Sequence, residues 1–225
     1  MNKYKKIVSI AATAVMCVAP MSVYAQEAQT DVIEAVAEKK QDTESSSVPV
    51  LQKEGIEISE GTGYDLSKEP GAATVKALEQ GTIVISYKTT SENAIQSLLS
   101  VGNGTKGNQD RHFHLYITNA GGVGMELRNT DGEFKYTLDC PAAVRGSYKG
   151  ERVSNTVALK ADKENKQYKL FANGELIATL DQEAFKFISD ITGVDNVMLG
   201  GTMRQGTVAY PFGGSIERMQ VYRDV

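Results

Sequence analysis

Short runs of alternating apolar and polar residues, broken by glycine, make up the chain from Gly55 onward. Their two-residue period is that of half-buried strands. The predicted strands are 82–89, 94–101, 111–118, 123–128, 134–138, 155–161, 167–172, 175–180, 196–199 and 215–222. Asn173-Gly174 predicts a type I′ hairpin turn between two of them. Short helices are expected only at 72–79 and at 182–188, the second capped by Asp181. The pattern therefore predicts an all-β sandwich with short helices.

The first 53 residues have a different composition. Lys3, Lys5 and Lys6 precede an apolar stretch at 7–20, and Val23-Tyr24-Ala25 resembles a cleavage site. Residues 1–25 are therefore predicted to be a secretory signal peptide, too short to span a membrane. Residues 26–53 are rich in Glu, Gln, Lys, Ser and Ala, which predicts a disordered acidic linker. We expect one β-sandwich domain over 54–225, in a protein that is secreted, extracellular or attached to the cell surface.

Charge and cysteine usage exclude several classes of function. Without the three lysines of the signal peptide, the chain has 21 basic and 28 acidic residues. Such an acidic chain is not expected to bind nucleic acid or to insert into a membrane. Cys140 is the one cysteine after residue 25, so no internal disulfide can form. The stretch 102–107, G-N-G-T-K-G, lacks the spacing of a phosphate-binding loop.

Strand periodicity brings a small set of polar residues to one surface. In 111–118, His112, His114 and Tyr116 point away from the face that carries the apolar residues. In 123–128, Glu126 and Arg128 do the same. The short link between the two strands predicts a hairpin, which puts Tyr116, Glu126 and Arg128 together. Taken alone, Glu126 and Arg128 are equally well read as a solvated ion pair.

The last 27 residues add a second cation and a second aromatic ring. Arg204 lies between glycine turns, and Tyr210 precedes Pro211. A fixed guanidinium and an aromatic ring on loops between strands suit an anionic, partly apolar ligand. No nucleophile with an adjacent base is evident near them.

The chain from about residue 50 to 225 resembles the sialic-acid-binding module of secreted bacterial sialidases, the family 40 carbohydrate-binding module. The matching segments are 64–67, 81–87, 98–102, 114–116, 125–128, 170–175 and 199–225. The resemblance implies a lectin-like jelly-roll β-sandwich of the concanavalin or laminin-G type. It also implies a partner domain, a C-terminal sialidase catalytic domain in the full-length protein.

The resemblance further implies a role for individual residues. Two arginines grip the carboxylate of sialic acid, and here they would be Arg128 and Arg204. An acidic residue, here Glu126, accepts from the amide N–H and a hydroxyl of the sugar. Tyr116, Tyr210 and Ile95 would pack on its ring, glycerol tail and acetamido methyl. The expected partners are sialylated glycans and mucin-type glycoproteins.

No metal or cofactor is expected. His112 and His114 share a strand face, but the sequence suggests no third ligand beside them. Asp65, Asp131 and Asp195 are candidates for calcium at the level of the fold, without a dense carboxylate cluster.

Two other classes of function stay open at this point. The parent proteins of the family are enzymes whose catalytic domain is a six-bladed propeller with tryptophan-containing boxes, and this chain has no tryptophan. We expect a binding module and no catalysis by this chain. The alternative is a laminin-G-like adhesive module that binds protein or neutral glycan, for which two convergent arginines have no use.

Overall fold

The computed structural model describes residues 48–105, 110–130, 134–141 and 153–225, all within one compact unit that spans 47–225. The predicted signal peptide, and the predicted linker up to residue 47, lie outside the described residues. In the described part of the chain, no helix has the length and apolarity that a bilayer crossing requires.

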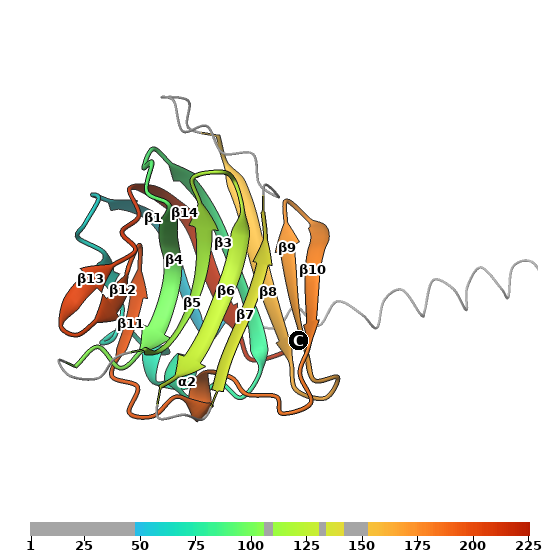
Figure 1. Ribbon diagram of the computed structural model, residues 1–225. Coiled ribbons are helices and arrows are strands. Elements are labelled where there is room, and N and C mark those ends of the chain that lie inside the picture. Colours follow the sequence, from blue (N-terminus) through green and yellow to red (C-terminus); the bar gives the residue numbers. More distant parts are fainter. Residues whose placement is uncertain (1–47, 106–109, 131–133, 142–152) are drawn as a thin grey trace, which may run out of the picture. The chain divides into compact units, whose positions relative to one another are not determined.

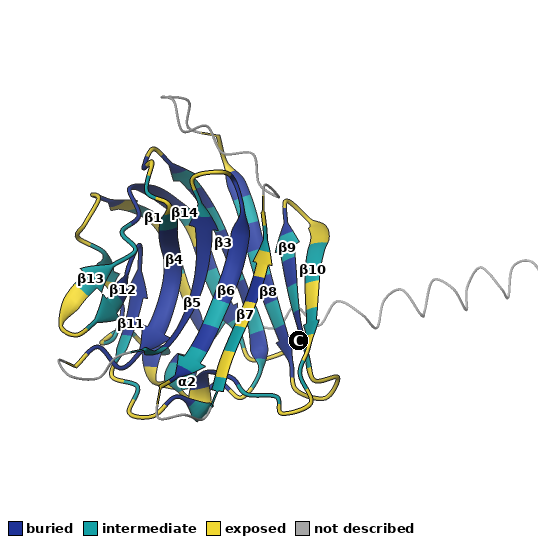
Figure 2. Cartoon of the chain, in the orientation of Figure 1, coloured by how far each residue is buried: buried dark blue, intermediate teal, exposed yellow. Residues whose placement is uncertain are grey.

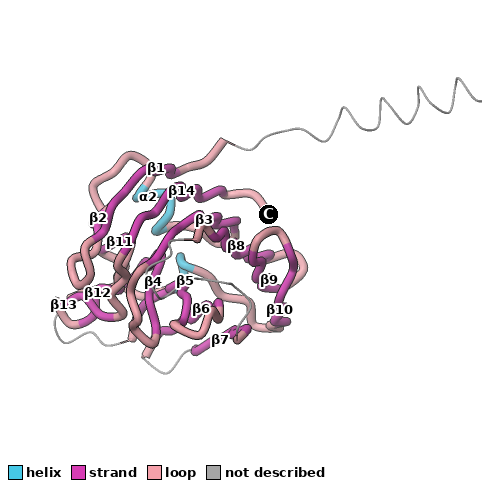
Figure 3. The backbone as a smooth tube through the Cα atoms, turned by 90° about the horizontal axis from the view of Figure 1, so that it is seen from above, coloured by secondary structure: helices cyan, strands magenta, loops and turns pink. Residues whose placement is uncertain are grey.

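Two antiparallel six-stranded sheets pack face to face (Figure 1). The first sheet has the order β1-β14-β3-β8-β9-β10, and the second the order β2-β11-β4-β5-β6-β7. The strands of the first sheet are β1 (Leu51–Ile58), β14 (Gly214–Tyr222), β3 (Gly81–Thr89), β8 (Asn155–Asp162), β9 (Gln167–Ala172) and β10 (Glu175–Asp181). Those of the second are β2 (Tyr64–Asp65), β11 (Asn196–Leu199), β4 (Ile95–Gly102), β5 (Arg111–Thr118), β6 (Val123–Asn129) and β7 (Phe134–Cys140). Seen from above in Figure 3, the sheets form two layers, which confirms the predicted β-sandwich.

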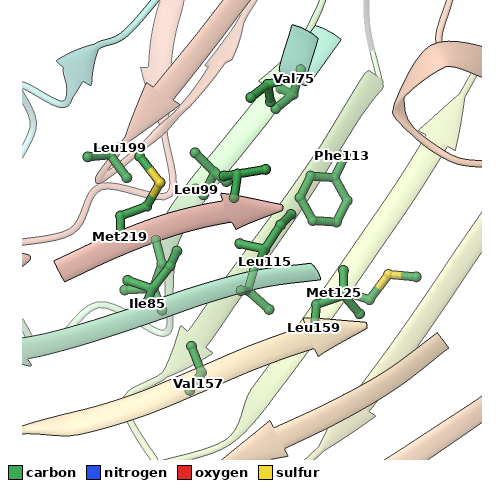
Figure 4. Packing of buried hydrophobic residues seen from close by; sticks show 14 of the residues in the cluster. Val75, Ile85, Leu99, Phe113, Leu115, Met125, Val157, Leu159, Leu199 and Met219 are labelled. Atoms are coloured by element: carbon green, nitrogen blue, oxygen red, sulfur yellow. The ribbon is translucent and has the colours of Figure 1, made fainter. Parts of the chain in front are cut away.

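The core fills the space between the layers. Phe113, Leu115 and Ile117 on β5 are fully buried, as the strand period predicted. Figure 4 shows Phe113 and Leu115, with Met125 of β6, in the core together with side chains of the first sheet: Ile85, Val157, Leu159 and Met219. Burial of this apolar surface holds the sandwich together without a disulfide. Cys140, the one cysteine in the described residues, is a half-buried free thiol.

The fold begins earlier than the sequence pattern indicates. β1 starts at Leu51, inside the 26–53 segment predicted as a linker. Leu51 is 3% exposed and pairs with Val221 of β14. The polar residues Gln52, Lys53 and Glu54 follow it, as is common on an edge strand, where charge discourages further pairing. Because these residues are polar, the sequence pattern did not indicate a strand here.

The predicted helix at 182–188 is wrong. That segment is irregular up to residue 187, and a 3-10 turn, η1 (Ile188–Asp190), begins at its last residue. Phe187 is fully buried, and the ring of Phe185 stacks on Tyr168 at 4.9 Å between centroids. An extended backbone keeps residues i and i+2 on one side, whereas a helix would turn them to opposite sides. The other predicted helix is shorter than expected, α2 (Ala72–Lys76).

The Asn173-Gly174 turn between β9 and β10 has a φ of 50° and 88° at its two residues, both positive as a type I′ turn requires. Another hairpin of the structure was not predicted. It joins β12 (Thr202–Arg204) to β13 (Thr207–Ala209) through Gln205 and Gly206, both also at positive φ. This β12–β13 hairpin matters for the site.

Candidate functional site

The outer face of the second sheet carries the predicted site. β5 and β6 pair so that Tyr116 lies opposite Gly124, His114 opposite Glu126, and His112 opposite Arg128. The predicted hairpin is therefore confirmed. These residues are not open to solvent, however: His112 is 1% exposed, His114 3% and Tyr116 6%. In Figure 2, β4, β5 and β6 are largely dark blue, because the outer face of the second sheet is covered as well as the inner one.

The cover over this face comes from the β12–β13 hairpin and from Tyr210, which follows it. Thr202 Oγ1 donates to Ser97 Oγ at 3.0 Å and lies 3.4 Å from Nδ1 of His114. The Tyr210 ring centroid lies 5.2 Å from that of His114, which also has the rings of Tyr116 at 4.7 Å and His112 at 5.2 Å. The sequence predicted the face on which His114 and Tyr116 lie, but not this cover.

Tyr210 has a strained backbone. Its φ is +53°, an uncommon value for a residue other than glycine. Such a conformation costs on the order of 1–3 kcal/mol and persists only where the surroundings impose it. Here the Tyr210 carbonyl accepts from the Ser97 N–H at 2.9 Å, and Arg204 Nη1 donates to the Tyr210 hydroxyl at 2.9 Å. The Tyr210 ring is thereby fixed beside the Arg204 guanidinium, whose Cζ lies 5.7 Å from the ring centroid.

The two predicted arginines meet through an acid that the sequence analysis missed, Asp110. One Asp110 oxygen accepts from Arg128 Nη2 at 3.0 Å, and the other accepts from Arg204 Nη2. Asp110 precedes β5 and has a φ of 55°, so the alternation of faces along the strand does not extend to it. The strand period therefore gave no signal for this residue. Arg128 Nε is buried and has no acceptor among the described residues.

Glu126 lies beside Arg128 and is held ionised. Its Oε1 is 3.3 Å from Arg128 Nη1 and 3.2 Å from His112 Nε2, and its Oε2 is 3.6 Å from Lys135 Nζ. Burial by itself would raise the pKa of this carboxyl, but the His112 hydrogen bond and the Arg128 charge outweigh it and lower the pKa to about 2. The pKa of His114 is lowered to about 3, first by burial and then by nearby positive charge, so its imidazole is neutral at neutral pH.

Tyr116 lies flat across β6 because residue 124 is a glycine. A Cβ on Gly124 would stand 2.4 Å from the Tyr116 Cζ. The Tyr116 hydroxyl donates to the Asp139 carboxylate on β7. Burial and this bond raise the pKa of the hydroxyl, so it remains a donor. Ile95, on β4, lies opposite Thr118 and lines a cavity with Tyr116, apart from the arginines.

Three possible metal ligands do come together, contrary to the sequence reasoning. His112, His114 and Glu126 present ligand atoms within 4.8 Å of one another. Glu126 already pairs with Arg128 and His112 through its Oε1. A cation would therefore compete with the Arg128 guanidinium. Of the calcium candidates, the Asp65 carboxylate accepts a hydrogen bond from the Ser67 N–H, and the Asp195 carboxylate accepts one from the Gly104 N–H. The third candidate, Asp131, lies outside the described residues. The expectation of no metal stays a prediction.

The arrangement suits an anion with an apolar body. Two guanidiniums are held in fixed orientations, that of Arg204 beside the Tyr210 ring, and each presents planar donors to a carboxylate. A larger cavity, about 750 Å³, lies beside α2, where Leu78 and Arg223 are among its walls. It shares no residue with the arginine cluster, so the candidate site is defined by its charges and rings.

Comparisons with known proteins identify the family. The sequence model of a family described as sialidase, N-terminal domain, matches residues 22–225. A solved Ruminococcus gnavus IT-sialidase CBM40, bound to α2,6-sialyllactose, is 99% identical and covers 79% of this chain and 94% of its own, with a TM-score of 0.77. The same module was also solved bound to α2,3-sialyllactose, at 96% identity, with the same coverage and a TM-score of 0.76.

A longer relative matches over the same region. The anhydrosialidase of the leech Macrobdella decora is 64% identical over 207 residues, which is 89% of this chain. The chain spans 27% of the length of that curated relative.

Proposed function

Because the chain belongs to the family described as sialidase, N-terminal domain, we propose that it is a non-catalytic module that binds terminal sialic acid through the sugar's carboxylate. The observation that carries this is the Arg128–Asp110–Arg204 cluster, in which one carboxylate orients two guanidiniums from different parts of the chain. The sialyllactose bound to the CBM40 of Ruminococcus gnavus IT-sialidase supports it.

Each component of the sugar has a matching group in the site. The carboxylate is met by the arginines, and the buried Arg128 Nε is a donor that an added acceptor would satisfy. Glu126, ionised by its neighbours, accepts from the amide N–H. Tyr116 and Tyr210 offer rigid faces for the apolar parts of the ring and tail, at low cost in conformational entropy.

The same geometry argues against catalysis at this site. A retaining glycosidase needs one carboxyl that donates a proton and another that attacks, roughly 5 Å apart. Glu126, with a pKa of about 2, holds no proton to donate at neutral pH. Asp110 is engaged by both guanidiniums. A laminin-G-like adhesive function for protein or neutral glycan is not favoured, because it leaves two convergent arginines without a purpose.

The role in the full-length protein is to retain an attached enzyme near its substrate. The curated leech relative is a sialidase of which this chain spans 27%. A tethered second site raises the local concentration of a catalytic domain at sialylated glycans, including mucin-type glycoproteins. Residues 1–25, with the composition of a signal peptide, support a secreted or cell-surface location.

The test measures sialyllactose binding by calorimetry for the full chain and for Arg204→Ala, Arg204→Lys and Arg218→Ala. A single-site lectin of this kind starts near −4 to −6 kcal/mol, roughly 1 mM to 40 μM. Loss of one bidentate arm costs about 2–4 kcal/mol, or roughly 30–1000-fold. Arg204→Ala therefore abolishes detectable binding. Arg204→Lys loses most of it, because an ammonium lacks the planar fork.

Arg218 is the matched control. It lies on β14 in the other sheet and pairs with Glu54 at 3.3 Å on an exposed surface. Its removal leaves binding unchanged. If Arg204→Ala binds sialyllactose as well as wild type does, the site is elsewhere. Turnover of a fluorogenic sialoside by the full chain that disappears in Glu126→Ala would overturn the non-catalytic assignment.

A further inference from the structure

The two guanidiniums of the site are balanced by two carboxylates. Asp110 accepts from both arginines, with 3.0 Å between Asp110 Oδ2 and Arg128 Nη2. Glu126 Oε1 lies 3.3 Å from Arg128 Nη1. These residues, Asp110, Glu126, Arg128 and Arg204, are called the charge cluster below, and their two positive and two negative charges cancel. Lys135 approaches Glu126 at 3.6 Å but is 58% exposed, so solvent screens most of its charge.

The Asp110 carboxylate has a fixed position in this cluster. Both of its oxygens accept from guanidiniums, and its backbone has a φ of 55°. Aspartate and asparagine are among the residues other than glycine that adopt this left-handed conformation most readily. Each guanidinium has five N–H donors, so donors remain for a ligand. An anion on the same two arginines therefore lies about 6 Å from the Asp110 carboxylate.

Asp110 has two opposing effects on such an anion. Its hydrogen bonds orient the guanidiniums of Arg128 and Arg204, which favours any planar or tetrahedral oxyanion alike. Its negative charge repels the anion, and this repulsion doubles when the anion carries two charges. The charge of the ligand is therefore the property on which Asp110 acts beyond its orienting role.

The size of this repulsion follows from Coulomb's law. The side chains of Asp110, Arg128 and Arg204 are between 15% and 27% exposed. For a site so close to solvent we take an effective dielectric constant of about 40–80. At about 6 Å, one elementary charge then changes the affinity for an anion by roughly 3-fold to 10-fold. The second charge of a dianion meets an additional penalty of this size.

We propose that Asp110 is a specificity-determining residue, whose charge restricts the site to anions with a single negative charge, such as the carboxylate of a sugar. This role rests on the proposed function, because it concerns the same two arginines. Doubly charged groups such as phosphate monoesters are disfavoured, although guanidinium forks match their geometry as well. The module thereby discriminates sialylated from phosphorylated glycans by charge, without a steric barrier.

The test uses two sialoside analogues that share a shape and differ in charge. In one, sulfonate replaces the carboxylate and carries one negative charge. In the other, phosphonate replaces it and carries two charges at about pH 9, where imidazoles are neutral. Calorimetry measures both analogues on the full chain as wild type, Asp110→Asn and Asp181→Asn. Asparagine keeps the size of Asp110 and tolerates the same backbone conformation.

Asp181 is the matched control. It lies on β10, at the edge of the other sheet, where it accepts from Gln167 Nε2 at 2.7 Å. Asp181→Asn removes the same charge from the protein as Asp110→Asn does, but at a distance where salt screens it. It therefore leaves the ratio of the two affinities within about twofold of wild type.

Wild type binds the phosphonate no tighter than the sulfonate, because the charges of the cluster cancel. In Asp110→Asn the ratio of phosphonate to sulfonate affinity rises by about 3-fold to 10-fold. A loss of guanidinium orientation weakens both analogues by the same factor and leaves this ratio unchanged. The ratio therefore reports the charge of Asp110 apart from its orienting role.

The outcomes separate the role of Asp110 from the function. An unchanged ratio in Asp110→Asn refutes the charge role, and sialyllactose binding by wild type still supports the function. Tighter binding of the phosphonate than of the sulfonate by wild type refutes it as well, without dependence on any variant. If wild type binds neither sialyllactose nor the analogues, the proposed function fails and the role of Asp110 with it.

Discussion

Gly124→Ala tests whether the Tyr116 ring must lie flat across β6 for the sugar to bind. The added methyl would stand 2.4 Å from Tyr116 Cζ, 2.5 Å from its hydroxyl oxygen and 2.4 Å from Asp139 Oδ1. Carbon atoms in contact normally stay about 3.5–4.0 Å apart. The ring must therefore retreat by about 1 Å or more, and its bond to Asp139 is strained or lost.

The energetic effect of Gly124→Ala on folding has opposing parts. Overpacking of this kind costs about 1–3 kcal/mol. The alanine restricts the unfolded chain, which returns about 0.4–1 kcal/mol. A net loss of about 1–2 kcal/mol lowers the Tm by roughly 2–8 °C for a chain of this size. Binding loses the aromatic contact, and we expect an affinity drop of about 10-fold, or about 1.4 kcal/mol.

A double-mutant cycle with Tyr116→Ala isolates the cause. In the Tyr116→Ala background the methyl on residue 124 meets no ring, so Gly124→Ala has no further effect on sialyllactose affinity by calorimetry. Tyr116→Phe is the control that keeps the ring and removes only its hydroxyl. If Gly124→Ala weakens binding by the same factor in both backgrounds, the effect does not pass through Tyr116 and the reasoning is wrong.

Three further results are expected from the charged and titrating groups. The folded-state pKa of His114, about 3, lies below its unfolded value of about 6.5. The unfolded chain therefore binds the proton more tightly, and the free energy of unfolding rises as the pH increases from about 3 to about 6.5. The slope is up to about 1.4 kcal/mol per pH unit, and denaturant unfolding of His114→Phe should lack this component. The Glu126 carboxyl, with a pKa of about 2, contributes stability above pH 4.5 that is lost as the pH falls toward 2; its carbon-13 shift should be flat from pH 7 to 4, and a midpoint near 4.5 would contradict the ion-pair geometry. Glu126→Gln should weaken binding less than Arg204→Ala does, and equal affinity of wild type for N-acetylneuraminic acid and its 5-deamino-5-hydroxy analogue would rule out the amide contact.

The sequence predicted those parts of the site that follow a single strand. The two-residue period of β5 and β6 placed Tyr116, Glu126 and Arg128 on one surface, and the β5–β6 register confirms it. The Asn173-Gly174 turn was predicted for a similar reason, since its two residues favour the required backbone conformation. In these cases local preference and tertiary structure agree.

The cover over the site depended on contacts between distant segments. β12 and β13 are three residues each, and the turn places Gln205 at a φ of +52°, which its residue type does not favour. No local pattern marks such a hairpin. The failed helix at 182–188 has the same origin, because the burial of Phe185 and Phe187 overrode local preference.

The bridge from Asp110 to both arginines has a kinetic consequence. The guanidiniums are already oriented in the unliganded protein, so association requires no rearrangement and proceeds at about 10⁶–10⁷ M⁻¹s⁻¹. With a dissociation constant of about 0.1–1 mM, the dissociation rate constant for a single sugar is on the order of 10²–10⁴ s⁻¹. A lone encounter is therefore brief, and residence on a glycan coat is governed by the density of sialylated termini within reach. A protein bearing this module would move across such a coat by rapid exchange between neighbouring chains.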